Sequence, residues 1–379
     1  MWAIAFAALF GWAVGAAVLS FLSGRAVPQG ALVNSLVYGC VLTTLAAINF
    51  EFQILEQKLA SDYAYQVFKG AADYDNFAMV AVVNAVPFAL TDVWWAAIGT
   101  NIAVLAIVKA YLYATSPRLS MLMWAPAVVN FGLFALRDPL IGLCFMVLTL
   151  FLCQTPTGLL GHAREIFWLA ASTLLRPETL VIYAGARVAG LRSRIRRQPW
   201  ILFLLPFIAA VLVYGVSYLP VLLGLKGQAG LLSLPSVLQE FFVARAERNT
   251  NVGEPSDILG GRLASLPFLV RYPIQILAFF ILPFPFEITT VPLALAFLDS
   301  VVFVAVAVVF WRRAPKPAKT LFVIFVLATA FFADNYGNLL RLRLPAYFIF
   351  SAGLLVSAKA ERAERSIEKQ KTAEGIDNI

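Results

Sequence analysis

The stretch Leu174-Leu175-Arg176-Pro177-Glu178-Thr179-Leu180 places two charges and a proline inside an otherwise apolar run. Each apolar flank is too short to cross a bilayer alone, because a spanning helix needs about 20 apolar residues. One straight helix through the stretch would hold Arg176 and Glu178 near the membrane centre, where each unpaired charge is costly. Since Pro177 has no amide donor, we expect one helix to end here and a second to turn back, with both charges in a water-filled cavity. A helix–helix ion pair that only fixes packing is the alternative, although intramembrane ionisable residues are functional candidates by default.

The composition excludes a soluble globular protein. Hydrophobic residues make up 61% of the chain and charged residues 13%, with a mean hydropathy of +0.82, whereas soluble domains are about half apolar. The apolar runs are long and continuous, unlike the short alternating segments of a membrane barrel. We therefore predict an all-α, polytopic transmembrane protein with about 10–12 transmembrane helices, some of them broken or re-entrant.

The apolar runs also indicate the organisation of the chain. Residues 1–358 form a single polytopic membrane domain with an outer-face region at about 225–290, and residues 359–379 form a charged cytoplasmic tail. The run at 274–288, interrupted by prolines, is expected to be re-entrant or interfacial. Helices are expected at about 2–22, 31–49, 93–114, 119–135, 139–153, 201–223, 291–311, 320–333 and 345–358.

The positions of basic residues indicate how the chain is oriented in the membrane. Residues 187–197 carry five arginines and no acid, which is typical of a cytoplasmic segment. Counting crossings from this segment places Arg137, Arg176 and Glu178 on the outer side and His162 on the cytoplasmic side. If 78–90 instead spans the membrane and 165–185 is one straight helix, Arg137 and His162 exchange sides. The net charge of +8 is explained by these segment ends, so nucleic acid is not an expected partner.

Under the preferred topology, one face collects arginines and carboxylates. The planar guanidinium fork binds phosphate oxygens bidentately, so we expect a lipid phosphate or diphosphate here, with a carboxylate accepting a proton from an attacking hydroxyl. No acidic pair has magnesium-ligand spacing, the three cysteines show no zinc or disulfide spacing, and no cofactor is expected. The gathered residues are Arg137, Arg176, Arg341, Arg343, Glu178, Asp138, Asp62 and Glu287.

Simpler interpretations exist for several of these residues. Asp138 followed by Pro139 is typical of a helix start, with the acid at the positive end of the helix dipole. Arg341 and Arg343 are also consistent with ordinary snorkelling side chains. Asp62 is consistent with the solvated end of an interfacial helix, and His162 with a capping or loop residue.

Several short motifs together resemble a known family. They are Asp62 with Tyr65 and Phe68, Leu136-Arg137-Asp138, Pro283-Phe284-Pro285-Phe286-Glu287, and the segment from Arg341 to Tyr347. In this order the chain resembles the O-antigen and capsule-type polysaccharide polymerases of the Wzy/EpsG type. It departs from their pattern at Lys58-Leu59-Ala60-Ser61, which replaces a glycine-rich approach to the aspartate, and at Arg176-Pro177-Glu178, where related chains tend to have a histidine.

The resemblance implies a GT-C-like, inverting and metal-independent glycosyltransferase in the bacterial inner membrane. Its active site would lie on the periplasmic side and polymerise undecaprenyl-diphosphate-linked oligosaccharide repeat units, alongside the flippase and chain-length regulator of the same pathway. The expected catalytic residues are Glu178, Asp62 and Asp138, and the expected diphosphate- or substrate-binding residues are Arg137, Arg176, Arg341, Arg343, Glu287 and Tyr65.

Two further function classes stay open. A glycosyltransferase that uses a polyprenyl-phosphate sugar would show an acidic pair in its first outer loop, and Asp73 and Asp75 match this only loosely; an O-antigen ligase would share the same chemistry. A lipid or solute transporter would need coupling residues deep in several helices, and the absence of a visible internal repeat disfavours a carrier built from inverted repeats.

Overall fold

The structure, a computed structural model, describes residues 8–9, 11–13, 27–52, 93–133, 138–154, 156–176, 178–190, 268–330 and 336–376. All regular elements in these ranges are helices, which confirms the all-α class. Four are long and apolar enough to cross a membrane: Gln29–Asn49, Ile98–Thr115, Leu293–Arg313 and Leu339–Gln370. The chain is therefore a helical membrane protein, while the total of 10–12 spans and the GT-C-like architecture remain predictions.

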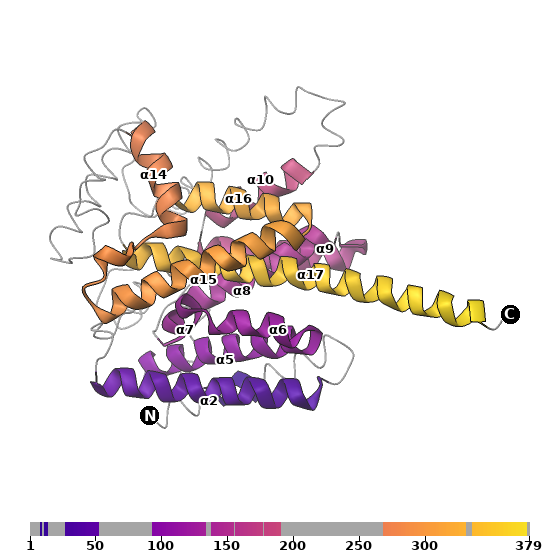
Figure 1. The fold of residues 1–379 in the computed structure, drawn as a ribbon, viewed down its shortest axis with the longest axis horizontal. Helices are drawn as coiled ribbons and strands as arrows, with labels where there is room; N and C mark the ends of the chain where they lie inside the picture. Colours follow the sequence, from indigo (N-terminus) through magenta and orange to yellow (C-terminus); the bar gives the residue numbers. More distant parts are fainter. Residues whose placement is uncertain are drawn as a thin grey trace.

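The helices pack as a bundle in which the axes of the long members α2, α5, α15 and α17 are roughly aligned (Figure 1). The elements are α2 (Gln29–Phe52), α5 (Val93–Thr115), α6 (Pro117–Ser120), η1 (Met121–Trp124), α7 (Pro126–Gly132), α8 (Asp138–Cys153), α9 (Gly158–Leu175), α10 (Glu178–Gly190), α14 (Phe268–Ile281), η3 (Pro285–Glu287), α15 (Val291–Arg313), α16 (Lys316–Ala330) and α17 (Tyr336–Ile376).

Helices α2 and α5 form an antiparallel pair at one side of the bundle (Figure 1). Gly30 faces Tyr113 and Gly39 faces Ala106, so residue numbers rise along one helix as they fall along the other. This agrees with the predicted helices at 31–49 and 93–114.

The helix expected at 119–135 is broken in the structure. The chain forms α6, the short 3-10 helix η1 and α7 in its place, with Pro117 and Pro126 in the first turns of α6 and α7. Each proline starts a helix easily but lacks the amide that would continue the preceding one. The buried Tyr38 hydroxyl of α2 donates a hydrogen bond to the Met123 carbonyl oxygen at 2.6 Å and so stabilises η1 within the bundle.

Helices α9 and α10 fold back on each other. The Tyr183 hydroxyl donates to the Glu165 carboxylate, and Arg187 Nε donates to the same carboxylate at 2.9 Å. In one straight helix, 18 residues would separate Tyr183 and Glu165 by about 27 Å. The contact therefore excludes the straight-helix alternative for 165–185 and confirms the predicted break between Leu175 and Glu178.

Helix α17 lies at the centre of the bundle and extends beyond it (Figure 1). It begins at Tyr336, so the predicted start of the last helix at about residue 345 is wrong, and Pro345 lies inside the helix. A proline inside a membrane helix is tolerated where neighbouring groups satisfy the freed backbone. From Lys359 to Gln370 the side chains are exposed, in agreement with the expected solvated tail helix.

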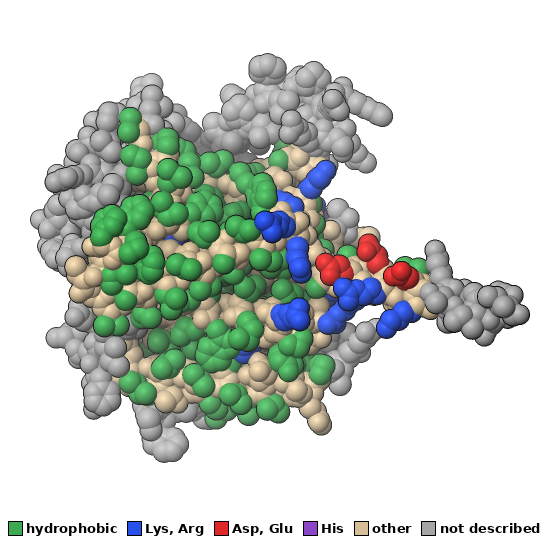
Figure 2. Space-filling model, in the orientation of Figure 1, with side chains coloured by type: hydrophobic (Ala, Val, Ile, Leu, Met, Phe, Trp, Pro, Cys, Tyr) green, Lys and Arg blue, Asp and Glu red, His purple; other side chains and the backbone are tan. Residues whose placement is uncertain are grey.

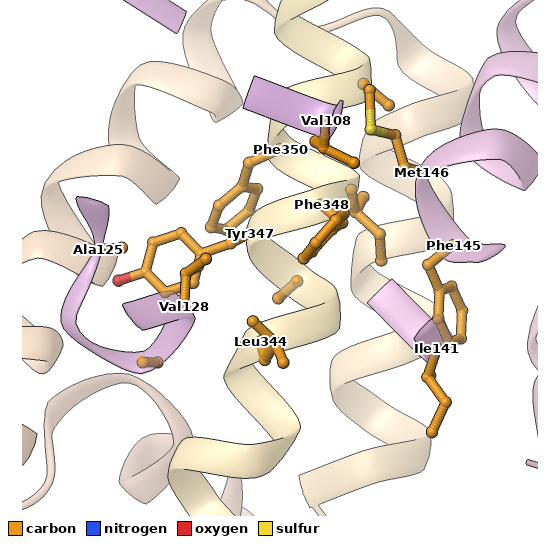
Figure 3. Close-up of a cluster of buried hydrophobic side chains, with 14 of the residues drawn as sticks. Val108, Ala125, Val128, Ile141, Phe145, Met146, Leu344, Tyr347, Phe348 and Phe350 are labelled. Carbon is orange, nitrogen blue, oxygen red and sulfur yellow. The ribbon is translucent and has the colours of Figure 1, made fainter. Parts of the chain in front are cut away.

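The core consists of apolar side chains that α17 buries against α5, α7 and α8 (Figure 3). Gly142 of α8 lies so close to the Phe348 ring that a Cβ atom there would come within 2.5 Å of it. Gly353 similarly lies against the Phe310 ring of α15, at 2.6 Å from such a Cβ. Small residues thus allow the close helix approach that is common in membrane bundles.

Three helices meet at one junction. Arg187 of α10 donates to Glu165 of α9 at 2.9 Å and to the Phe151 carbonyl of α8 at 3.3 Å. From this junction, α8 extends toward its first residue, Asp138, and α10 extends toward its first residue, Glu178. Helix α9 extends toward its last residue, Leu175. Asp138 and Glu178 therefore lie at the same end of the bundle.

Helices α15 and α17 are parallel, because Arg343 bonds Ser300 at 2.8 Å and Ser357 bonds the Arg313 carbonyl at 2.8 Å. Their first residues lie at one end of the bundle and their basic segments at the other. We call the first end the paired end; it carries Asp138, Arg176, Glu178, Glu287 and Arg341. We call the other the basic end; it carries Arg118, Arg187, Arg312, Arg313 and Lys316.

Candidate functional site

The first component of the site is the turn between α9 and α10. Arg176 follows the last residue of α9 in an extended conformation, with φ −155° and ψ 98°, as expected for a residue that precedes proline. Its Nε atom donates to Glu178 Oε1 at 2.7 Å. Glu178 is the first residue of α10, where the helix dipole favours a carboxylate. The Glu178 side chain is 31% exposed, so a substrate can reach it.

Two buried polar atoms beside this ion pair have no hydrogen-bond partner in the described part of the chain. They are Arg176 Nη1 and the hydroxyl oxygen of Thr179. A buried polar group without a partner costs about 1–3 kcal/mol, and more if it is charged. A ligand acceptor that hydrogen-bonds Arg176 Nη1 would remove the cost for that atom, which makes the turn a candidate anion-binding site.

A separate ion pair at the same end of the bundle joins α8 to α17. Arg341 Nε donates to Asp138 Oδ2 at 2.7 Å, with the Asp138 side chain 1% exposed and the Arg341 side chain 29% exposed. Asp138 begins α8, which confirms the predicted helix start. The carboxylate therefore holds the guanidinium in place, and Arg341 presents the accessible part of the pair.

Arg343 was predicted to lie beside Arg341 in the diphosphate site, but its side chain is completely buried in the interior. Its guanidinium donates to the Phe279 and Leu282 carbonyl oxygens, both at 2.8 Å, to Ser300 Oγ at 2.8 Å and to Asp299 Oδ2 at 3.3 Å. These bonds tie the end of α14 to α15 and α17. In this arrangement Arg343 has no accessible nitrogen to offer a ligand, and it supports the helix that carries Arg341.

The sequence interpretation missed Asp299, the buried partner of Arg343. Its Oδ1 atom accepts hydrogen bonds from the Tyr347 hydroxyl at 3.0 Å and from the Ala127 amide at 2.9 Å. The signal was available, because Asp299 is a carboxylate within an apolar run, the same property that singled out Arg176 and Glu178.

The sequence interpretation also missed Lys109, another charged residue within an apolar run. It lies within the apolar run of α5 and is 1% exposed. Its Nζ donates to the Ser120 carbonyl oxygen at 3.1 Å and lies 5.0 Å and 5.1 Å from the ring centres of Tyr38 and Trp124. These contacts connect α5 to α6 and η1, which is a structural role.

His162 lies in the second turn of α9, at the basic end of the bundle. Its Nδ1 atom is 3.8 Å from Glu165, which also holds Tyr183 and Arg187. The structure therefore keeps the single histidine of the chain at the end opposite Arg176.

The remaining predicted residues are only partly described. Glu287 accepts a hydrogen bond from the Phe284 amide at 2.7 Å and so closes its own turn at the paired end. Arg137, Asp62 and Tyr65 lie outside the described residues, and their assignments stay predictions.

Within the ranges that the structure describes, no group of three or more His, Cys, Asp or Glu side chains is placed to hold a metal ion. No protein-family model, curated protein or solved structure matches the chain.

Proposed function

We propose that the chain is a membrane glycosyltransferase that polymerises undecaprenyl-diphosphate-linked oligosaccharide repeat units on the periplasmic side of the bacterial inner membrane. The observation that carries this proposal is the buried Arg176 Nη1 without a partner, beside an accessible carboxylate. Arginine binds diphosphate oxygens through its planar fork, and Arg341 at the same end of the bundle supplies a second accessible guanidinium.

In this mechanism Glu178 is the general base. It accepts the proton from the acceptor hydroxyl while that oxygen attacks the anomeric carbon of the donor glycan. The bond from the anomeric carbon to the diphosphate breaks, and undecaprenyl diphosphate leaves with its negative charge held by Arg176 and Arg341. Attack opposite to the leaving group inverts the anomeric configuration.

The geometry favours Glu178 over Asp138 as the base. Glu178 is about one-third exposed at the start of α10, whereas Asp138 is buried and bonded to Arg341. Asp138 is better suited to orient Arg341 than to reach a substrate hydroxyl. A transporter is less well supported, because the charges deepest in the described helices, Lys109, Asp299 and Arg343, are buried and bonded to protein groups.

Polymer length tests the proposal. In a deletion strain complemented with variants, Arg176→Lys and Arg341→Lys retain the charge but lose the fork, and we expect shortened glycan chains on a gel. Arg118→Lys, at the exposed basic end, is the matched control and should preserve full length. Full-length polymer from both site variants would exclude a diphosphate site at the paired end. If the wild-type gene does not restore a ladder of glycan chain lengths on the gel, polymerisation by this protein is excluded.

A further inference from the structure

An apolar groove runs between α14, α15 and α16 on the surface of the bundle. Its volume is about 470 Å³, within the range of roughly 300–1,000 Å³ that small-ligand sites occupy. Its walls are aliphatic and aromatic, and Val308 and Leu327 are 47% and 43% exposed. The walls include Ile276 and Phe280 from α14, Val304 and Val308 from α15, and Val323 and Leu327 from α16.

The lining of the groove changes from apolar to basic near the end of α15. Trp311 and Arg312 line this end of it, and the Trp311 side chain is 53% exposed. Lys319 Nζ of α16 lies 6.0 Å from the Trp311 ring centre. An exposed tryptophan next to basic residues is typical of the region where lipid headgroups meet water.

The positive charge at this mouth is not neutralised by the described protein. Arg312 is exposed, and no ion pair joins it to a carboxylate in the ranges that the structure covers. Figure 2 shows Lys and Arg side chains gathered where the body of the molecule meets the projecting part of α17. The mouth is therefore complementary to an anionic group, while the groove behind it is complementary to a hydrocarbon chain.

We propose that this groove is a binding site for an anionic phospholipid, whose acyl chain lies between α14, α15 and α16 and whose phosphate contacts Arg312 and Lys319. Basic pockets between transmembrane helices bind anionic headgroups in this way. A second copy of the chain is a poorer occupant, because two copies inserted in the same orientation would bring their basic ends together. The site lies at the end opposite Arg176 and does not depend on the proposed glycosyl transfer.

The test uses the full chain, purified in a non-ionic detergent and depleted of lipid. Phosphatidylglycerol and phosphatidylcholine with identical acyl chains are titrated separately, and the thermal unfolding temperature is measured. We expect saturable stabilisation by phosphatidylglycerol and weaker stabilisation by phosphatidylcholine. Arg312→Gln should raise the half-saturating phosphatidylglycerol concentration about fivefold, the effect of one basic side chain on anionic lipid.

Two further variants make the result specific. Ala307→Phe fills the groove beside Val308 and should abolish the saturable stabilisation. Arg118→Gln removes an exposed charge at the same end on α6, away from the groove, and should leave it unchanged. Since Arg312 is exposed, its variant reports on binding even if Ala307→Phe fails to fold.

Equal stabilisation by the two phospholipids would overturn the proposal, as would unchanged half-saturation in Arg312→Gln. A polyprenyl monophosphate that displaces phosphatidylglycerol from the wild type at equal concentration would show that the groove takes an isoprenoid chain instead. A dimer that forms on lipid removal and disappears in Ala307→Phe would assign the groove to a second copy.

Discussion

Arg176 donates from Nε to Glu178 at 2.7 Å, so the two charges that break the apolar run also bind each other across the turn between α9 and α10. The pair leaves Arg176 Nη1 buried without a partner in the described residues. An ion pair needed only for packing would be expected to satisfy its donors, because buried polar groups in proteins are almost always hydrogen-bonded. We therefore infer that Arg176 Nη1 is a donor to a ligand.

Glu178→Gln preserves shape and hydrogen bonding but cannot accept a proton. We expect turnover on lipid-linked repeat units to fall by about two to four orders of magnitude, as for positioned proton transfer, while donor binding is largely retained. Polymer formation in membranes, normalised to folded protein, measures this. Glu361→Gln, in the exposed part of α17, is the control and should have no effect. Near-normal turnover of well-folded Glu178→Gln would exclude Glu178 as the general base and leave Asp138 and Asp62 as the next candidates.

Asp299→Asn should destabilise the protein strongly. The change retains the acceptor for Tyr347 but leaves the Arg343 charge buried without its counter-ion, and breaking a buried pair costs about 3–5 kcal/mol. Thermal unfolding in detergent measures the loss of stability. The double variant Asp299→Leu with Arg343→Met removes both charges and should recover part of that stability. Arg365→Gln removes an exposed ion pair with Glu361 and serves as the control; equal melting temperatures for Asp299→Asn and Arg365→Gln would refute the structural role of the pair.

Gly353→Ala should lower stability, because its Cβ atom would lie 2.6 Å from the buried Phe310 ring and overpacking costs about 1–3 kcal/mol. Gly185→Ala is the matched control on α10, since its Cβ atom would meet Ile324 at an ordinary 3.6 Å. The comparison requires only the melting temperatures of the two purified variants. If Gly353→Ala melts no lower than Gly185→Ala, α17 does not approach α15 as closely as described.

Cysteine labelling tests which end faces outward. In a background without Cys40, Cys144 and Cys153, we expect Thr289→Cys, at the paired end, to react with an impermeant maleimide in intact cells. Glu361→Cys, on the exposed tail of α17, should react only after the membrane is permeabilised. The reverse pattern would place the paired end in the cytoplasm and remove the periplasmic assignment.

Much of the helical pattern was predictable because apolar run length specifies membrane helices directly. The runs that became α2, α5, α8 and α15 were placed within a few residues. The break at Arg176 followed from proline chemistry and from the cost of a mid-membrane charge.

Other features depend on tertiary contacts that no local pattern contains. Pro345 suggested a helix start, yet α17 continues through it in the packed bundle. Arg343 resembled Arg341 in the sequence, but its position two residues along the helix directs it to Asp299 rather than to Asp138. A pattern of arginines indicates charge and not which partner each guanidinium finds.

The most direct test of the central claim is mass spectrometry of the lipids that co-purify with the full chain from its own cells. We expect wild-type protein to retain an undecaprenyl-diphosphate-linked oligosaccharide. Arg176→Gln should reduce its occupancy about tenfold, as for the loss of a charged hydrogen bond, and Arg118→Gln should not change it. Equal occupancy in wild type and Arg176→Gln, or a wild-type protein that carries only phospholipid, would contradict the account.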